Sequence, residues 1–165
     1  MKNFNSNTKN SDEWLTPPEI IKALGDFDMD PCTLAKMPWS TANVMLCKER
    51  DGDGLSAPWY GRVWCNPPYG KETFKWLDKL SKHPQKGIAL IFARTDTVGF
   101  HKTVLSKADA IFFFQGRLKF YKPDGTQGGT ANAPSCLVSY SRLDTRSIEQ
   151  AIAHEKLKGH IVYLK

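Results

Sequence analysis

Four consecutive residues carry the clearest chemistry in the chain: Asn66, Pro67, Pro68 and Tyr69. The Asn66 amide oxygen and the Pro67 carbonyl oxygen are neighbouring hydrogen-bond acceptors, and a proline adds no N–H of its own. Two acceptors suit an NH₂ group, which has two hydrogens to donate, and Tyr69 offers a flat ring for stacking. A rigid turn would account for the prolines alone but would not require Asn66 or Tyr69. The tetrapeptide therefore indicates a site for a planar group that carries an amine.

The elements around this tetrapeptide are expected to be a strand before it and a helix after it. The apolar run 61–65 (GRVWC) reads as a strand, and residues 71–83 place apolar side chains at intervals of three, as a helix does. Ligands of open α/β sheets bind beyond the carboxyl ends of the strands. The tetrapeptide is therefore expected at such an end.

The rest of the chain alternates between strand and helix patterns. A first helix is expected from Thr16 as N-cap, with Pro17 at its first position and Glu19 completing a capping box. Further strands are expected at 27–30 (stopped by Pro31), 43–48, 87–93, 110–114, 117–121, 136–140 and 160–164, with helices at 97–107 and near 148–157. This order predicts an α/β fold, with a mainly parallel sheet and an antiparallel hairpin at its edge.

Length and composition limit the function classes. A chain of 165 residues suits one domain, and 41% hydrophobic with 24% charged residues excludes a fibrous or wholly disordered chain. We expect a polar, mobile tail over residues 1–11 and a single domain over 12–165. No stretch has the pattern of a membrane span or a secretory signal, so a cytoplasmic protein is expected. The net charge of +6 permits a polyanionic partner such as nucleic acid.

The sequence has few features of a metal site, a nucleotide hydrolase or a serine hydrolase. The four cysteines form no CxxC pair and the four histidines lack paired spacing, so no metal site is expected. A GxxxxGK[ST] phosphate loop and a GxSxG nucleophile motif are both missing from the sequence.

Several short segments occur together in a characteristic order. They are 14–18 (WLTPP), 28–31 (DMDP), 53–55 (DGL), 62–70 (RVWCNPPYG), 93–97 (ARTDT) and 116–120 (GRLKF). Over about residues 12–142, this set resembles the phage-type DNA N-6-adenine methyltransferases, which are related to the Dam group. The tetrapeptide by itself is shared with RNA and protein-glutamine methyltransferases, whereas the whole ordered set is more specific.

The resemblance implies a Rossmann-like methyltransferase domain that transfers a methyl group from S-adenosylmethionine to N6 of a flipped adenine in double-stranded DNA. S-adenosylhomocysteine would be the second product, and the cytoplasm of a bacterial or phage-infected cell would be its location. It implies catalytic roles for Asn66, Pro67, Pro68 and Tyr69, cofactor contacts from Thr16, Pro17, Asp30, Pro31 and Asp53, and DNA contacts from Arg94, Arg117, Lys119 and Lys122. The sequence departs from larger relatives at 32–35 (CTLA), where they carry a glycine-rich loop.

Two alternatives stay open on the sequence. The acceptor could be another planar amino group, such as an rRNA base or a protein glutamine. The chain could also be a methyltransferase-like module that binds DNA without a cofactor, which the missing glycines after Pro31 would favour. The glycines of residues 125–133 predict a loop that becomes ordered only on DNA.

Overall fold

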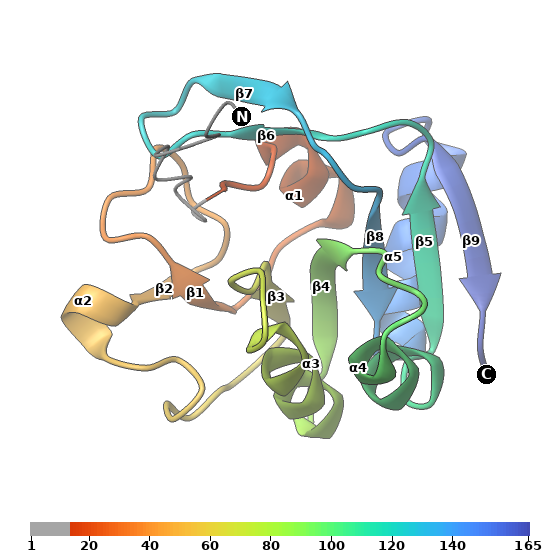
Figure 1. The fold of residues 1–165 in the computed structure, drawn as a ribbon, viewed down its shortest axis with the longest axis horizontal. Coiled ribbons are helices and arrows are strands. Elements are labelled where there is room, and N and C mark those ends of the chain that lie inside the picture. Colours follow the sequence, from red (N-terminus) through yellow and green to blue (C-terminus); the bar gives the residue numbers. More distant parts are fainter. Residues whose placement is uncertain (1–13) are drawn as a thin grey trace, which may run out of the picture.

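The computed structural model describes residues 14–165, so the tail expected over residues 1–11 lies outside the described residues. A seven-stranded sheet forms the central layer, and helices cover both of its faces (Figure 1). The helical segments are α1 (Pro18–Leu24), α2 (Lys48–Asp51), α3 (Thr73–Lys82), α4 (Val98–Phe100), the wider π-helical turn η1 (His101–Leu105) and α5 (Arg142–Ala153). The main strands are β1 (Met29–Thr33), β2 (Val44–Cys47), β3 (Val63–Cys65), β4 (Gly87–Phe92), β5 (Ala110–Phe114), β8 (Ser135–Ser139) and β9 (Gly159–Tyr163). None of the helices in this part of the chain has the length and apolar run needed to span a membrane.

The sheet has the order β2-β1-β3-β4-β8-β5-β9. Strands β2, β1, β3 and β4 run parallel to one another, whereas β8 is antiparallel to both β4 and β5, and β9 is antiparallel to β5. A mixed sheet with a parallel core is typical of Rossmann-like methyltransferases, so the expected fold class is confirmed.

The antiparallel part of the sheet is arranged differently from the expectation. Residues 117–121 and 136–140 do not pair with each other. Strand β8 lies instead between β4 and β5 of the main sheet, where all five of its residues are buried. Strand β6 (Lys119–Tyr121) pairs instead with β7 (Gln127–Thr130) in a separate two-stranded sheet.

The glycine-rich loop of residues 125–133 has local hydrogen bonds of its own, and the expectation that it becomes ordered only on DNA stays a prediction. The Lys122 amide donates to the Thr126 carbonyl at 2.8 Å, which closes the turn between β6 and β7. Asp124 accepts bonds from the amide and the hydroxyl of Thr126. These local bonds offset the entropy that the glycines lose on ordering.

Two apolar clusters hold the layers together. On one face, α3 and η1 contribute Leu77 and Val104 to a cluster with β3 and β4. On the other face, α1 and α5 contribute Ile20 and Ile148 to a cluster that includes the fully buried Trp64 of β3. Strand β3, which leads into Asn66, is therefore buried on both faces.

Two of the expected boundaries that differ from the structure lie next to the site described below. Strand β1 does not stop at Pro31 but continues to Thr33, with a register shift against β2 between Asp30 and Thr33 that accommodates the missing proline N–H. Helix α1 has Pro17, not Thr16, as its N-cap, and no side chain caps it. Thr16 is engaged instead by Asn66, as described below.

Candidate active site

A pocket of about 260 Å³ opens at the carboxyl ends of β1 and β3. It brings together eight residues predicted from the sequence: Thr16, Asp30, Pro31, Asp53, Asn66, Pro67, Pro68 and Tyr69. Pro17 is not among the lining residues and is buried at the start of α1. The carboxyl edge of the parallel strands thus carries the pocket, as expected for this class of sheet.

The side-chain amide of Asn66 is held in one orientation. Its Nδ2 donates to the Trp14 carbonyl oxygen at 3.1 Å and to Thr16 Oγ1 at 3.2 Å. Both hydrogens of this amide are thereby used, so the Oδ1 atom remains as the acceptor. Within residues 14–165, no hydrogen bond uses the neighbouring Pro67 carbonyl oxygen. The two acceptors singled out in the sequence are thus both present.

Tyr69 is half-buried beside Asn66, and its hydroxyl donates to Asn66 Oδ1 at 3.4 Å. Burial raises the pKa of this hydroxyl above its usual range, so it stays a neutral donor. Its ring stacks on Phe92, with 4.2 Å between ring centres and 13° between planes. A planar group that stacks on Tyr69 must therefore use the opposite face of the ring.

Asp30 is a buried carboxylate, 4% exposed, in the wall of the pocket. It accepts hydrogen bonds from Thr41 Oγ1 at 2.6 Å and from the Cys32 amide at 3.1 Å. Burial raises the pKa of Asp30 to about 6, because the two hydrogen bonds offset only part of the cost of desolvating its charge. A cationic group in the pocket would stabilise this carboxylate.

Asp53 is exposed at the pocket and also caps the turn that follows it. Its Oδ1 accepts a bond from the Leu55 amide at 2.9 Å. The next residue, Gly54, is buried so tightly that a Cβ atom there would lie 2.0 Å from the Pro31 carbonyl oxygen. The pocket wall therefore needs glycine at this position. Gly54 thus lets the 53–57 turn pack directly against Pro31 of β1.

The segment without glycines after Pro31 is an extension of β1. Cys32 Sγ donates to the backbone oxygen of Asn66 at 3.3 Å, and Thr33 Oγ1 donates to the Leu46 carbonyl at 2.9 Å. Cys32, Thr33 and Leu34 all line the pocket. The first two residues of this segment are thus extended strand and not a glycine-rich loop.

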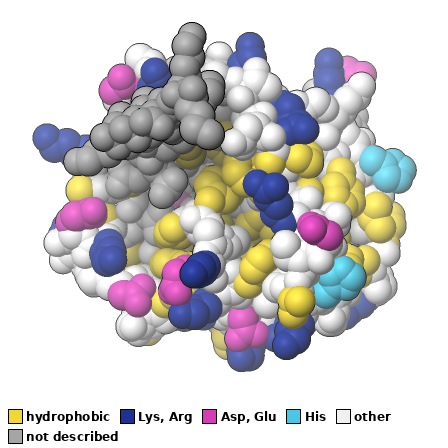
Figure 2. All heavy atoms as spheres, viewed as in Figure 1, with side chains coloured by type: hydrophobic (Ala, Val, Ile, Leu, Met, Phe, Trp, Pro, Cys, Tyr) yellow, Lys and Arg dark blue, Asp and Glu magenta, His cyan; other side chains and the backbone are white. Residues whose placement is uncertain are grey.

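The basic residues predicted to contact DNA lie outside the pocket lining and are exposed. Arg94 follows β4, with its guanidinium carbon 5.8 Å from the centre of the Phe92 ring. Arg117, Lys119 and Lys122 lie just before, on and just after β6. On the face viewed in Figure 2, Lys and Arg side chains are spread among hydrophobic ones and do not gather into one patch.

A family model described as DNA N-6-adenine-methyltransferase (Dam) matches residues 4–161, nearly the whole chain. The chain belongs to this Dam family. It is an S-adenosylmethionine-dependent enzyme that methylates N6 of adenine in DNA, which confirms the resemblance seen in the sequence. Comparisons with curated proteins and with solved structures gave no match.

The pocket of this Dam-family enzyme fits the chemistry of its cofactor. The buried Asp30 carboxylate suits an ammonium group, and Glu49 and Asp53 add acceptors for hydroxyl or amino groups. Trp76 and Met37 supply apolar surface to the same lining. S-adenosylmethionine combines these features, because it carries an amino acid, a ribose and an adenine.

Sequence reasoning missed several lining residues. Glu49 lies just after β2, so the rule of strand carboxyl ends would have pointed to it. Thr41 and Trp14 carry no such signal, since their contacts to Asp30 and Asn66 are made across the fold.

Proposed function

We propose that Asn66 Oδ1 and the Pro67 carbonyl oxygen accept the two hydrogens of adenine N6. The lone pair of this nitrogen is delocalised into the ring, and two acceptors favour the tetrahedral nitrogen on which the lone pair is available. The proton can leave after the nitrogen has become positive, so no strong base is required. When bound, S-adenosylmethionine supplies an electrophilic methyl group on its sulfonium sulfur. The gain comes from positioning and from acceptors matched to the developing charge.

The observation that carries this proposal is the anchored amide of Asn66. Because Nδ2 is tied to Trp14 and Thr16, the amide cannot turn over without losing two hydrogen bonds. A site that must accept hydrogens from an amine needs this orientation. The opposite orientation would present donors to the substrate.

We further propose that the target adenine leaves double-stranded DNA and stacks on the face of Tyr69 that Phe92 leaves free. Extruding the base costs a few kcal/mol, which stacking and backbone contacts offset. Pro68 shapes the turn between Pro67 and Tyr69. Within this proposal, Arg94, Arg117, Lys119 and Lys122 hold the DNA backbone near the pocket.

The cofactor-side assignments complete the proposal. Asp30 takes the ammonium group of the cofactor, Asp53 faces its adenosine, and Pro31 forms the wall between them. Thr16 contributes to the wall while it orients Asn66, and Pro17 fixes the segment that carries Thr16 by beginning α1. We propose that these residues belong to one domain over 12–165 that acts in the cytoplasm, where the DNA of bacterial and phage-infected cells lies.

The test is methyl transfer by Asn66→Ala, measured as labelled methyl in duplex DNA with N6-methyladenine identified by mass spectrometry. The variant should lose at least about a hundredfold in kcat, because it removes one acceptor made for the transition state. Asn43→Ala is the control, since Asn43 is exposed just before β2 and does not line the pocket. Normal transfer by Asn66→Ala would contradict the proposed mechanism.

A further inference from the structure

One charged side chain outside the proposed mechanism is unusually well coordinated. The ammonium of Lys79, on α3, donates to the backbone oxygens of Ala57 at 2.5 Å, Leu55 at 2.6 Å and Gly54 at 3.4 Å. It also lies 4.7 Å from the ring centre of Trp59. A lysine has three hydrogens to donate, and all three are used here.

These three carbonyls converge because residues 53–57 form a single helical turn. The amides of Ser56 and Ala57 donate to the Asp53 carbonyl at 2.9 and 3.1 Å. A single turn ends with carbonyls that have no partner in the helix, and their negative ends point the same way. Lys79 satisfies them with one positive charge. Burial lowers the pKa of Lys79, because the charged ammonium is partly removed from water here.

The same turn forms part of the pocket wall. Asp53 and Gly54 line the pocket, whereas Lys79 does not. Gly54 is wedged between the Pro31 carbonyl and Trp76, and its own carbonyl accepts a bond from Trp59 Nε1 at 2.8 Å. Trp59 in turn stacks with Trp76 at 6.1 Å between ring centres. Any shift of the turn would therefore change the wall.

We propose that Lys79 is a positioning residue for the cofactor: it fixes the 53–57 turn so that Asp53 and Gly54 complete the cofactor wall. This inference rests on the proposed function, which assigns the pocket to the cofactor. Asn66 is anchored separately, by Trp14 and Thr16. Loss of Lys79 should therefore weaken cofactor binding and leave the methyl-transfer step intact.

The test is calorimetric titration of S-adenosylhomocysteine into the cofactor-free enzyme. Lys79→Met should raise Kd by about tenfold, as expected for the loss of charge-assisted hydrogen bonds. Its kcat at saturating S-adenosylmethionine should stay within about twofold of wild type, since the substitution does not move the Asn66 side chain. Lys79→Arg, which keeps the charge and the donors, should recover much of the affinity. Lys75→Met is the matched control, because Lys75 is an exposed lysine of the same helix.

Each outcome separates this inference from the proposed function. If wild type binds S-adenosylhomocysteine and Lys79→Met binds it equally well, the role of Lys79 is wrong and the proposed function stands. If Lys79→Met and Lys79→Arg both lose kcat as much as affinity, Lys79 is merely structural. If Asp30→Asn binds as well as wild type, the assignment of the pocket fails, and the role of Lys79 fails with it.

Discussion

At the scale of single residues, the site is built from groups whose hydrogen bonds decide which atom faces the substrate. Asn66 is the clearest example, because its donors are used by the protein and its acceptor is left. Asp30 is the second example, since its hydrogen bonds in the folded protein do not fully offset the desolvation of its buried carboxylate. Buried charge of this kind is typical of functional sites.

The raised pKa of Asp30 predicts opposite effects on stability and on binding. Between about pH 4 and pH 6 the folded protein holds a proton on Asp30 that the unfolded chain releases, so stability falls as pH rises through this range. Above it, the buried charge costs about 3 kcal/mol. Asp30→Asn should therefore raise the free energy of unfolding at pH 8 by about 1–3 kcal/mol and change it little at pH 4.

The same substitution should weaken cofactor binding at pH 8, where wild-type Asp30 is ionised. Wild-type affinity should itself decline as pH falls below about 6, when Asp30 becomes protonated. Denaturant unfolding and calorimetry at both pH values measure the two effects. A variant that is less stable at pH 8 yet binds the cofactor normally would contradict this role.

The residue types of the site could be predicted from the sequence, whereas their contacts could not. The order of Asp30, Asn66 and Tyr69 along expected strands was sufficient to predict a pocket at the carboxyl edge. The anchoring of Asn66 by Thr16 was missed, because Thr16 was expected to cap α1. A threonine before Pro17 fits a cap pattern equally well, and only the packed fold shows that its hydroxyl meets another element.

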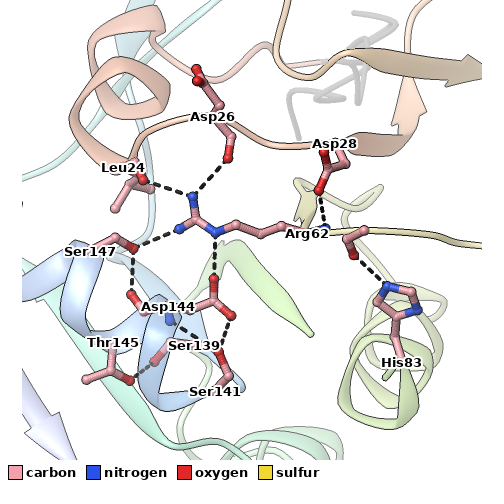
Figure 3. Close-up of polar contacts among 11 residues, drawn as sticks. Leu24, Asp26, Asp28, Arg62, His83, Ser139, Ser141, Asp144, Thr145 and Ser147 are labelled. Carbon is pink, nitrogen blue, oxygen red and sulfur yellow. Dashed lines mark hydrogen bonds and ion pairs between the residues drawn. The ribbon is translucent and has the colours of Figure 1, made fainter. Parts of the chain in front are cut away.

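At the scale of elements, β3 is held at both ends. At its amino end, Arg62 donates to Asp144 of α5 at 2.7 Å, to Ser147 at 2.7 Å and to the carbonyls of Leu24 and Asp26 at 3.0 Å (Figure 3). Asp144 is 2% exposed, so this ion pair is largely buried and fixes α5 and α1 against the strand. At its carboxyl end, Asn66 is tied to the segment before α1. The strand therefore places the Asn66 amide, to which we assign the catalytic role, on a rigid support.

The β6–β7 hairpin is joined to that same segment. Leu15 and Tyr121 exchange backbone hydrogen bonds at 2.8 and 3.0 Å, and Gly128 of β7 packs under the Trp14 ring. A Cβ atom at Gly128 would lie 2.7 Å from that ring, whereas one at Gly129 meets nothing within 4 Å. The hairpin thus contacts the residue whose carbonyl orients Asn66.

Gly128→Val should therefore displace Trp14 and lower kcat by about tenfold or more, because small misplacements of reacting groups are costly. Its affinity for DNA should stay near that of wild type. Gly129→Val, on the same strand, should leave kcat unchanged. Steady-state methyl transfer measures both variants, and equal kcat values for the two would contradict the link between hairpin and site.

The elements themselves were mostly predictable, but their pairing was only partly so. The parallel core followed from buried strands that alternate with helices. The position of β8 between β4 and β5 did not, because its sequence is equally compatible with a hairpin partner for residues 117–121. Strand pairing between distant segments depends on which runs are buried on both faces, and this becomes visible only in the assembled sheet.

At the scale of the whole molecule, one short chain must provide cofactor binding, methyl transfer and DNA contact. Asp30 lies in β1 and Asn66 directly follows the neighbouring β3, and only β2 and α2 stand between these two strands in the chain. No inserted recognition domain lies there. We therefore expect short segments near the carboxyl edge to contact DNA, and the net charge of +6 favours this binding.

DNA affinity should depend on where the positive charges lie, and not only on the net charge of the protein. Lys119→Gln with Lys122→Gln should reduce the slope of log K against log salt by about 2, since each lost phosphate contact contributes about 0.9. Lys82→Gln with Lys102→Gln removes the same charge from α3 and η1, which lie away from the hairpin. Fluorescence anisotropy with duplex DNA at several salt concentrations compares the pairs. Equal changes in slope would show that only net charge matters.

The central claim is that Asn66 Oδ1 and the Pro67 carbonyl accept the two hydrogens of the target amine. The most direct measurement is a crystal structure of the enzyme with S-adenosylhomocysteine and duplex DNA that contains the methylated sequence. We predict an extruded adenine on Tyr69, with N6 about 3 Å from both acceptor oxygens and the Nδ2 of Asn66 still bound to Trp14 and Thr16. An adenine whose N6 meets other acceptors, or an Asn66 amide turned to present Nδ2, would contradict the account.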